Sequence, residues 1–153
     1  MKKLSFIFAC LVFFGPKLQA QKDSTTKDPL LTNVTIEVYN INDPLLFASS
    51  LDFSIRSSVG SEKYAIQSIL GSIEIGEQRT LQMDILNKQV TKSAIFNSKV
   101  VILFNSRSSD DFIGILNFIF DFSDGSTYNY KFGTLIIGND MKLPSVTRGI
   151  FVH

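Results

Sequence analysis

The chain has 153 residues, with 15 Lys and Arg against 14 Asp and Glu, one histidine and one cysteine. This near balance of charge gives no reason to expect a nucleic acid or an anionic membrane as partner. The only histidine, His153, is the last residue, so histidine-based triads and the usual zinc sites are excluded within one copy of the chain.

Residues 1–20 have the layout of a secretory signal peptide. Two lysines precede an apolar run at residues 4–14, and the letters LQA then lead into a polar stretch. We therefore expect cleavage after Ala20. The apolar run is too short to span a bilayer, which favours a cleaved leader over a membrane anchor. The mature chain, beginning at Gln21, is predicted to have no transmembrane helix.

Cleavage would also remove Cys10, the only cysteine, and leave a chain without disulfides or a thiol nucleophile. Three of the 15 basic residues leave with the leader, so 12 remain against 14 acidic residues. A short lysine-led leader without disulfides downstream indicates export to the periplasm or cell surface of a bacterium. The alternative is a lipoprotein leader acylated at Cys10, which requires a longer apolar run before the cysteine.

The rest of the chain reads as a flexible polar arm at residues 21–32 and a single domain at residues 33–153. Only residues 87–96 have helical spacing, enough for one or two turns between strands. Short strands at regular spacing predict an all-β fold, an antiparallel immunoglobulin-like β-sandwich of roughly 7–9 strands. Besides the hairpin described next, strands are expected at residues 33–41, 50–57, 63–70, 72–75, 79–86, 99–104, 134–138 and 146–152.

Ser123, Asp124 and Gly125 lie between two alternating runs and predict a β-hairpin. A two-residue loop would mix aromatic and polar side chains on each face, whereas a three-residue loop separates them, so we expect the three-residue loop. The aromatic stripe is then a buried sheet face. The expected cross-strand pairs are Phe122 with Ser126, Phe120 with Tyr128, Phe118 with Tyr130, Leu116 with Phe132, Asn117 with Lys131, Ile119 with Asn129 and Asp121 with Thr127.

Two stretches within residues 34–86, VTIEVYNINDPLLFASSLDFSI and SIEIGEQRTLQMDI, resemble immunoglobulin-like β-sandwich modules of the LEA-2/WHy type. In those modules a strand ends in an asparagine- and proline-containing turn, and a later glycine turn precedes an alternating strand. The resemblance implies a sandwich fold and brings no catalytic residues with it. The matching positions are Asn40, Asn42, Pro44, Leu45 and Gly76.

Carboxylates are the remaining candidates for catalysis. Asp121 and Asp124 flank the predicted hairpin turn, and Asp110 and Asp111 precede the hairpin. A glycosidase needs two acids at a set separation, one with a raised pKa, and the pattern places no two acids on one apolar face. The segment at residues 121–125 also lacks the further oxygen ligands of a calcium loop. We therefore predict no catalytic residue, no cofactor and no metal site.

Aromatic side chains are more plausible as core than as a ligand platform in a cysteine-free sandwich. Tyr39 and Tyr64 are the exceptions, and we predict them as a possible ligand or partner surface. Tyr39 falls on the polar side of its strand, opposite three apolar residues.

Three functions from different classes remain open. The leading one is an exported, non-catalytic binding or structural module of the cell envelope, with an unidentified protein or glycan as partner. The second is a small outer-membrane β-barrel, although the predicted strands are shorter than membrane strands and carry charges on their second face. The third is a carboxylate-dependent polysaccharide hydrolase, which would use Asp121 or Asp124.

Overall fold

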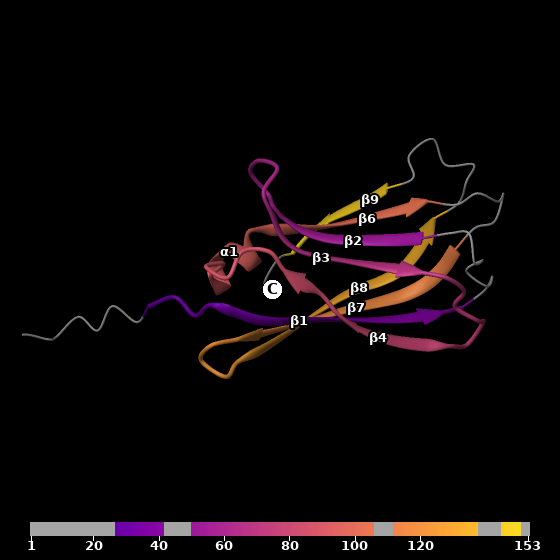
Figure 1. Cartoon of the computed structure of the whole chain (residues 1–153), viewed down its shortest axis with the longest axis horizontal. Coiled ribbons are helices and arrows are strands. Elements are labelled where there is room, and N and C mark those ends of the chain that lie inside the picture. The colour runs from indigo at the N-terminus through magenta and orange to yellow at the C-terminus, as the bar shows by residue number, and fades with distance from the viewer. Residues whose placement is uncertain (1–26, 42–49, 106–111, 138–144, 151–153) are drawn as a thin grey trace, which may run out of the picture.

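The computed structural model describes residues 27–41, 50–105, 112–137 and 145–150, which form an antiparallel β-sandwich (Figure 1). This confirms the predicted all-β fold class. The calls on Cys10, Asp110, Asp111, His153 and the leader fall outside these ranges. The elements are β1 (Leu31–Asn40), β2 (Ser50–Ser57), β3 (Lys63–Leu70), β4 (Gln78–Gln82), β5 (Asp84–Ile85), α1 (Lys92–Phe96), β6 (Ser98–Asn105), β7 (Phe112–Phe122), β8 (Thr127–Ile137) and β9 (Ser145–Gly149).

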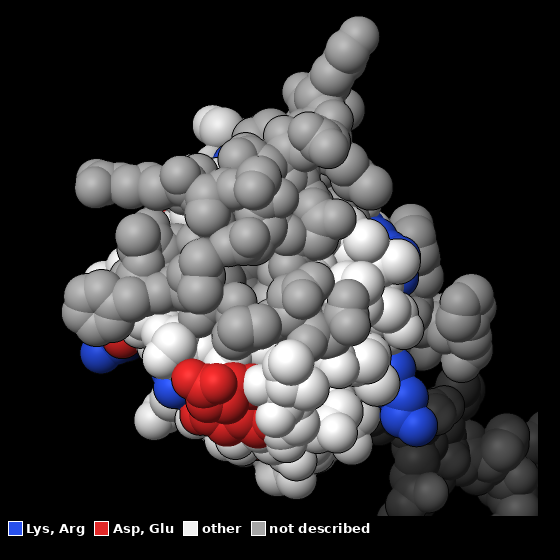
Figure 2. Space-filling model, turned by 90° about the vertical axis from the view of Figure 1, so that its right-hand side faces the viewer, with Lys and Arg blue, Asp and Glu red and all other residues white. Residues whose placement is uncertain are grey.

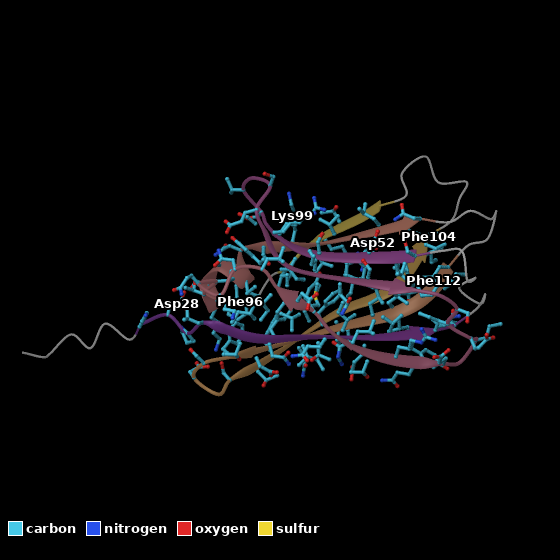
Figure 3. All side chains as sticks on the ribbon, viewed as in Figure 1. Asp28, Asp52, Phe96, Lys99, Phe104 and Phe112 are labelled. Carbon is cyan, nitrogen blue, oxygen red and sulfur yellow. The ribbon has the colours of Figure 1, made fainter. Side chains whose placement is uncertain are left out.

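The strands form two separate sheets. One has four strands in the order β4-β1-β7-β8, and the other has five in the order β5-β3-β2-β6-β9. Every neighbouring pair is antiparallel. The sheets lie face to face over a core of side chains instead of joining into one closed barrel (Figures 1 and 3).

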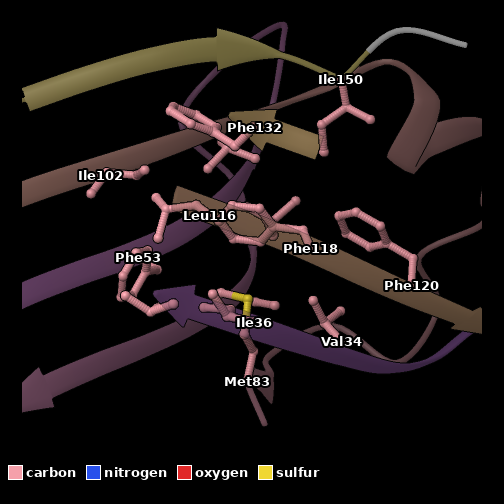
Figure 4. Packing of buried hydrophobic residues seen from close by; sticks show 14 of the residues in the cluster. Val34, Ile36, Phe53, Met83, Ile102, Leu116, Phe118, Phe120, Phe132 and Ile150 are labelled. Atoms are coloured by element: carbon pink, nitrogen blue, oxygen red, sulfur yellow. The ribbon is translucent and has the colours of Figure 1, made fainter. Parts of the chain in front are cut away.

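The core is made by the inward side chains of both sheets (Figure 4). Phe53 of β2 meets Phe118 of β7 in an edge-to-face contact, with ring centroids 6.2 Å apart, and so joins the two sheets. Phe104 and Phe112, labelled in Figure 3, belong to the same buried cluster. Without a disulfide in the described domain, this packing supplies the main stabilisation.

The β7–β8 hairpin has the three-residue loop that its sequence predicts. The Phe122 N–H donates to the Ser126 carbonyl over 2.9 Å, and the Gly125 N–H donates back to the Phe122 carbonyl. Gly125 has a φ of +79°, as a bulged turn requires. The expected pairs from Asp121 with Thr127 to Asn117 with Lys131 are all present.

One expected pair is wrong, because β8 contains a β-bulge. Leu116 lies opposite Gly133 instead of Phe132, and the register shifts between Leu116 and Asn117. Gly133 has a φ of +84°, which favours glycine at such a position. The extra residue allows Phe132 and Leu135, three positions apart, both to face the core. Residues 134–137 of the strand predicted at 134–138 belong to β8 and do not form a new strand.

The predicted strand at residues 79–86 is divided between the two sheets. β4 pairs with β1 in one sheet, and β5 pairs with β3 in the other. Met83 lies at the crossing, where it is buried and its N–H donates to the Val34 carbonyl over 2.8 Å. Residues 72–75, also predicted as a strand, belong to the connection before β4, although Ile73 is fully buried.

The end of the predicted arm is part of the domain. β1 begins at Leu31, two residues before the predicted boundary, and Leu31 is buried. The Leu31 N–H donates to the Val90 carbonyl over 2.8 Å. The boundary was misplaced because the segment before α1 offers a pairing partner that only the folded chain brings close. α1 itself confirms the predicted short helix, capped by the Thr91 hydroxyl, which accepts from the Ala94 N–H.

Candidate binding surface

Asp121 and Asp124 hold the β7–β8 hairpin in place. Asp121 accepts hydrogen bonds from the Asn33 amide over 3.0 Å and from the Thr127 hydroxyl over 2.8 Å. Asp124 accepts from the N–H and the hydroxyl of Ser126, over 2.9 and 2.6 Å, and lies 3.7 Å from the Lys92 ammonium. Both carboxylates are thereby used to join neighbouring strands and to close the turn.

The electrostatics of Asp124 agree with this structural role. Hydrogen bonds from Ser126 lower the pKa of the Asp124 carboxyl below its ordinary value, and the Lys92 charge adds to the effect. A general acid in glycoside hydrolysis needs the opposite, a raised pKa. Within the described ranges, no group of three or more His, Cys, Asp or Glu side chains is arranged to hold a metal ion.

Tyr64, predicted as part of a possible binding surface, is in the core instead. Its exposed fraction is 9%, and it belongs to the main buried cluster. The register of β2 and β3 shifts beside it, between the pairs Ile55 with Ala65 and Arg56 with Lys63. This bulge turns Tyr64 and Ala65, which are consecutive, toward the same interior. Simple alternation does not reveal such a change of direction.

Tyr39 is exposed, as its place on the polar side of β1 predicts, and it lies in a patch that the sequence reasoning did not identify. Tyr39 is opposite Ile115, and the Ile41 N–H donates to the Ile113 carbonyl, which brings those two residues side by side. Ile113 is in turn opposite Ile136. We call these five residues, all on the outer face of sheet β4-β1-β7-β8, the isoleucine patch.

Four members of the isoleucine patch are large apolar residues that remain exposed in the folded chain. The exposed fractions are 41% for Tyr39, 40% for Ile41, 44% for Ile115 and 52% for Ile136. The patch lies toward the end of the sandwich that faces the viewer in Figure 2, where the described residues are mostly uncharged and include one main acidic cluster. A contiguous apolar area of this kind on a monomer is a typical interaction site.

The rest of the same outer face is mainly polar. Next to the patch, Glu37 lies opposite Asn117, which donates to its carboxylate over 2.9 Å. Beyond them, Asn33 bridges the Thr35 hydroxyl and Asp121. Side chains in the half of the face nearest the β7–β8 turn are therefore mainly polar, with Ile119 half-buried among them, whereas large exposed apolar side chains occur only in the other half among the described residues of this face. This division distinguishes the patch from isolated exposed residues such as Val59, 87% exposed after β2.

The outer face of the other sheet differs in that its apolar residues Ile66, Val101 and Leu103 are buried or half-buried, and cations lie at one end. Arg56 lies opposite Lys63 on one side and Lys99 on the other, so three cations form a row across β3, β2 and β6 (Figure 3 labels Lys99). Among the described residues none of these cations takes part in an ion pair. Such a row is well hydrated and does not favour an apolar partner. The isoleucine patch is therefore the stronger candidate surface.

Within the described ranges no helix has the length and the apolar character that crossing a bilayer requires. Comparison with known proteins identifies no relative: no family model, no curated protein and no solved structure matches this chain.

Proposed function

We propose that the protein is an exported, non-catalytic module of the bacterial cell envelope that binds a partner protein through the isoleucine patch. The observation that carries this proposal is the exposure of Tyr39, Ile41, Ile115 and Ile136 together on one half of a sheet face. Export rests on the signal-peptide layout of residues 1–20.

A protein partner is favoured over a glycan by the chemistry of the patch. Isoleucine offers neither hydrogen-bonding groups for sugar hydroxyls nor a flat ring for stacking. Tyr39 is the only aromatic residue of the five. The centre of a protein interface is apolar and its rim is polar, and the pair Glu37 and Asn117 borders the patch in that way.

The structural roles of Asp121 and Asp124 also support a binding function over a carboxylate-dependent hydrolase. Both side chains accept hydrogen bonds that hold the hairpin, and the pKa of Asp124 is lowered. No observation favours the hydrolase as a second candidate.

Photo-crosslinking in the native bacterium tests the binding surface. A benzophenone amino acid at position 115 or 136 should give a discrete protein adduct in the envelope fraction. In the matched controls the benzophenone amino acid replaces Val59, which is exposed but isolated, or Thr80, an exposed polar residue on the same sheet face as the patch. Equal crosslinking at position 59, or none at positions 115 and 136, would contradict the proposed site.

Export is checked separately by intact-mass analysis of the envelope material. The expected mass is that of the chain beginning at Gln21. A mass that includes the leader, or a lipid on Cys10, would overturn the localisation without bearing on the patch.

A further inference from the structure

Each sheet ends in two edge strands, and these differ greatly in length. β4 and β9 have five residues each and β5 has two, whereas β8 has eleven. Short edge strands are one means by which proteins avoid pairing with other chains. β8 is not protected in this way, so its free side needs separate consideration.

The hydrogen-bond pattern of the hairpin shows which backbone groups of β8 point away from β7. Because Phe122 and Ser126 form a hydrogen-bonded pair, the ladder directs the backbone groups of Tyr128 and Tyr130 toward β7. The N–H and C=O groups of Thr127, Asn129 and Lys131 then point to the opposite side. No strand of the described chain pairs with β8 there.

The second half of the β8 edge is covered. Arg148 of β9 donates a hydrogen bond to the Phe132 carbonyl, and its guanidinium lies 4.5 Å from the centre of the Phe132 ring. The bulge at Gly133 interrupts the edge at the same place. Both features are common protections of an edge strand, and they begin only after Lys131.

A depression of about 420 Å³ runs beside the uncovered half, between the edges of β8 and β9. Tyr128, Tyr130, Phe132 and Arg148 contribute to its walls. Tyr128 and Tyr130 are half-buried, and the Tyr130 hydroxyl donates to the Gly149 carbonyl over 2.9 Å. A strand added beside β8 would direct every second side chain into this depression and the others to the outer face.

We infer that the edge of β8 from Thr127 to Lys131 accepts an extended segment of a partner polypeptide as a fifth strand of the sheet. Three N–H and three C=O groups point outward for its backbone, and no described strand pairs with them. Its apolar side chains at alternate positions lie against Tyr128 and Tyr130, and its other side chains lie beside Thr127, Asn129 and Lys131. Backbone pairing supplies the affinity and the aromatic depression the selectivity, as in other strand-addition complexes.

Amide hydrogen exchange of the full chain tests this inference residue by residue. In the free protein, the amides of Tyr128 and Tyr130 should exchange slowly and those of Thr127, Asn129 and Lys131 quickly. The probe is a synthetic peptide of alternating threonine and valine with lysines at both ends. At saturation it should slow exchange of the latter three amides by at least about tenfold, through backbone pairing.

The matched control is a peptide of the same composition with the valines in one block. Its backbone can still pair, but its valines cannot all enter the depression, so its protection at the same concentration should be clearly weaker. Asn129→Pro should abolish the protection. It removes an N–H that points away from β7, and proline is tolerated on the free side of an edge strand. Tyr128→Pro, which removes an N–H bonded to β7, should instead disrupt the hairpin.

Three outcomes would overturn the inference. These are no protection by the alternating peptide, equal protection by the block peptide, or concentration-dependent protection of the three amides without any peptide. The last result would mean that a second copy of the chain occupies the edge. The exchange pattern of the unmodified chain decides the matter even where Asn129→Pro fails to fold.

Discussion

The inner and outer faces of sheet β4-β1-β7-β8 are built from the same strands but serve different purposes. On the inner face, Phe118 and Phe120 are fully buried against the other sheet. On the outer face, Asn117 is bonded to Glu37, while Ile115 remains exposed. The inner positions are constrained by packing, whereas the outer ones are free to vary. The difference teaches that burial does not account for the isoleucines on the outer face, and the proposed partner binding would give their exposure a reason.

The largest expected effect compares an apolar residue on each face of β7. Phe120→Ala should lower the free energy of unfolding by about 3–5 kcal/mol, the usual cost of removing a buried phenylalanine. Ile115→Ala, on the outer face, should cost about 1 kcal/mol or less. Denaturant unfolding of both variants measures the difference. Similar losses of stability would show that Phe120 is not more deeply buried than Ile115, contrary to the structure.

The turn that sets the β7–β8 register, and with it which side chains face the core, is tested at Gly125. An added β-carbon there meets no atom within 4 Å, so the cost of substitution comes from the positive φ of +79° alone. Gly125→Ala should destabilise by about 1–2 kcal/mol. Gly125→Asn should cost less, because asparagine tolerates the left-handed region. Thermal or denaturant melts of the two variants give the comparison, and equal costs would argue against this backbone conformation.

A smaller effect is expected from the pH dependence of the same turn. Since hydrogen bonds from Ser126 lower the pKa of Asp124 in the folded state, its carboxylate form stabilises the fold. This contribution is complete above the ordinary value of 3.8 and is lost as the pH falls through the lower folded value. The stability difference between the wild type and Asp124→Asn should therefore narrow below about pH 4.

Unfolding curves of both proteins at several pH values measure this difference directly. The pKa of Asp28 and of Glu77 is lowered as well, so the wild type alone will lose stability in acid for more than one reason. Subtracting the stability of Asp124→Asn from that of the wild type removes the acid-induced loss that both proteins share. A difference that widens in acid would contradict the role assigned to Asp124.

The exposure of Tyr39 was predictable, but most of its neighbours in the patch were not. Ile115 and Ile136 lie far from Tyr39 in sequence, and only the pairing of β1 with β7 and of β7 with β8 brings them together. Once the β7–β8 register is known, the outward position of Ile115 follows from its place next to the buried Leu116. The sequence therefore indicates that Ile115 points outward, but only the strand order shows that it lies beside Tyr39.

The features that the sequence by itself determined are local ones: the alternation along single strands, the three-residue turn at Gly125 and the short helix after Thr91. Each depends on neighbouring residues, whose spacing is written in the chain. The tertiary structure alone decided the crossing between sheets at Met83, the bulges at Gly133 and Tyr64, and the start of β1 at Leu31. These depend on which distant strand lies alongside and on how much space the core leaves, and no local pattern carries that information.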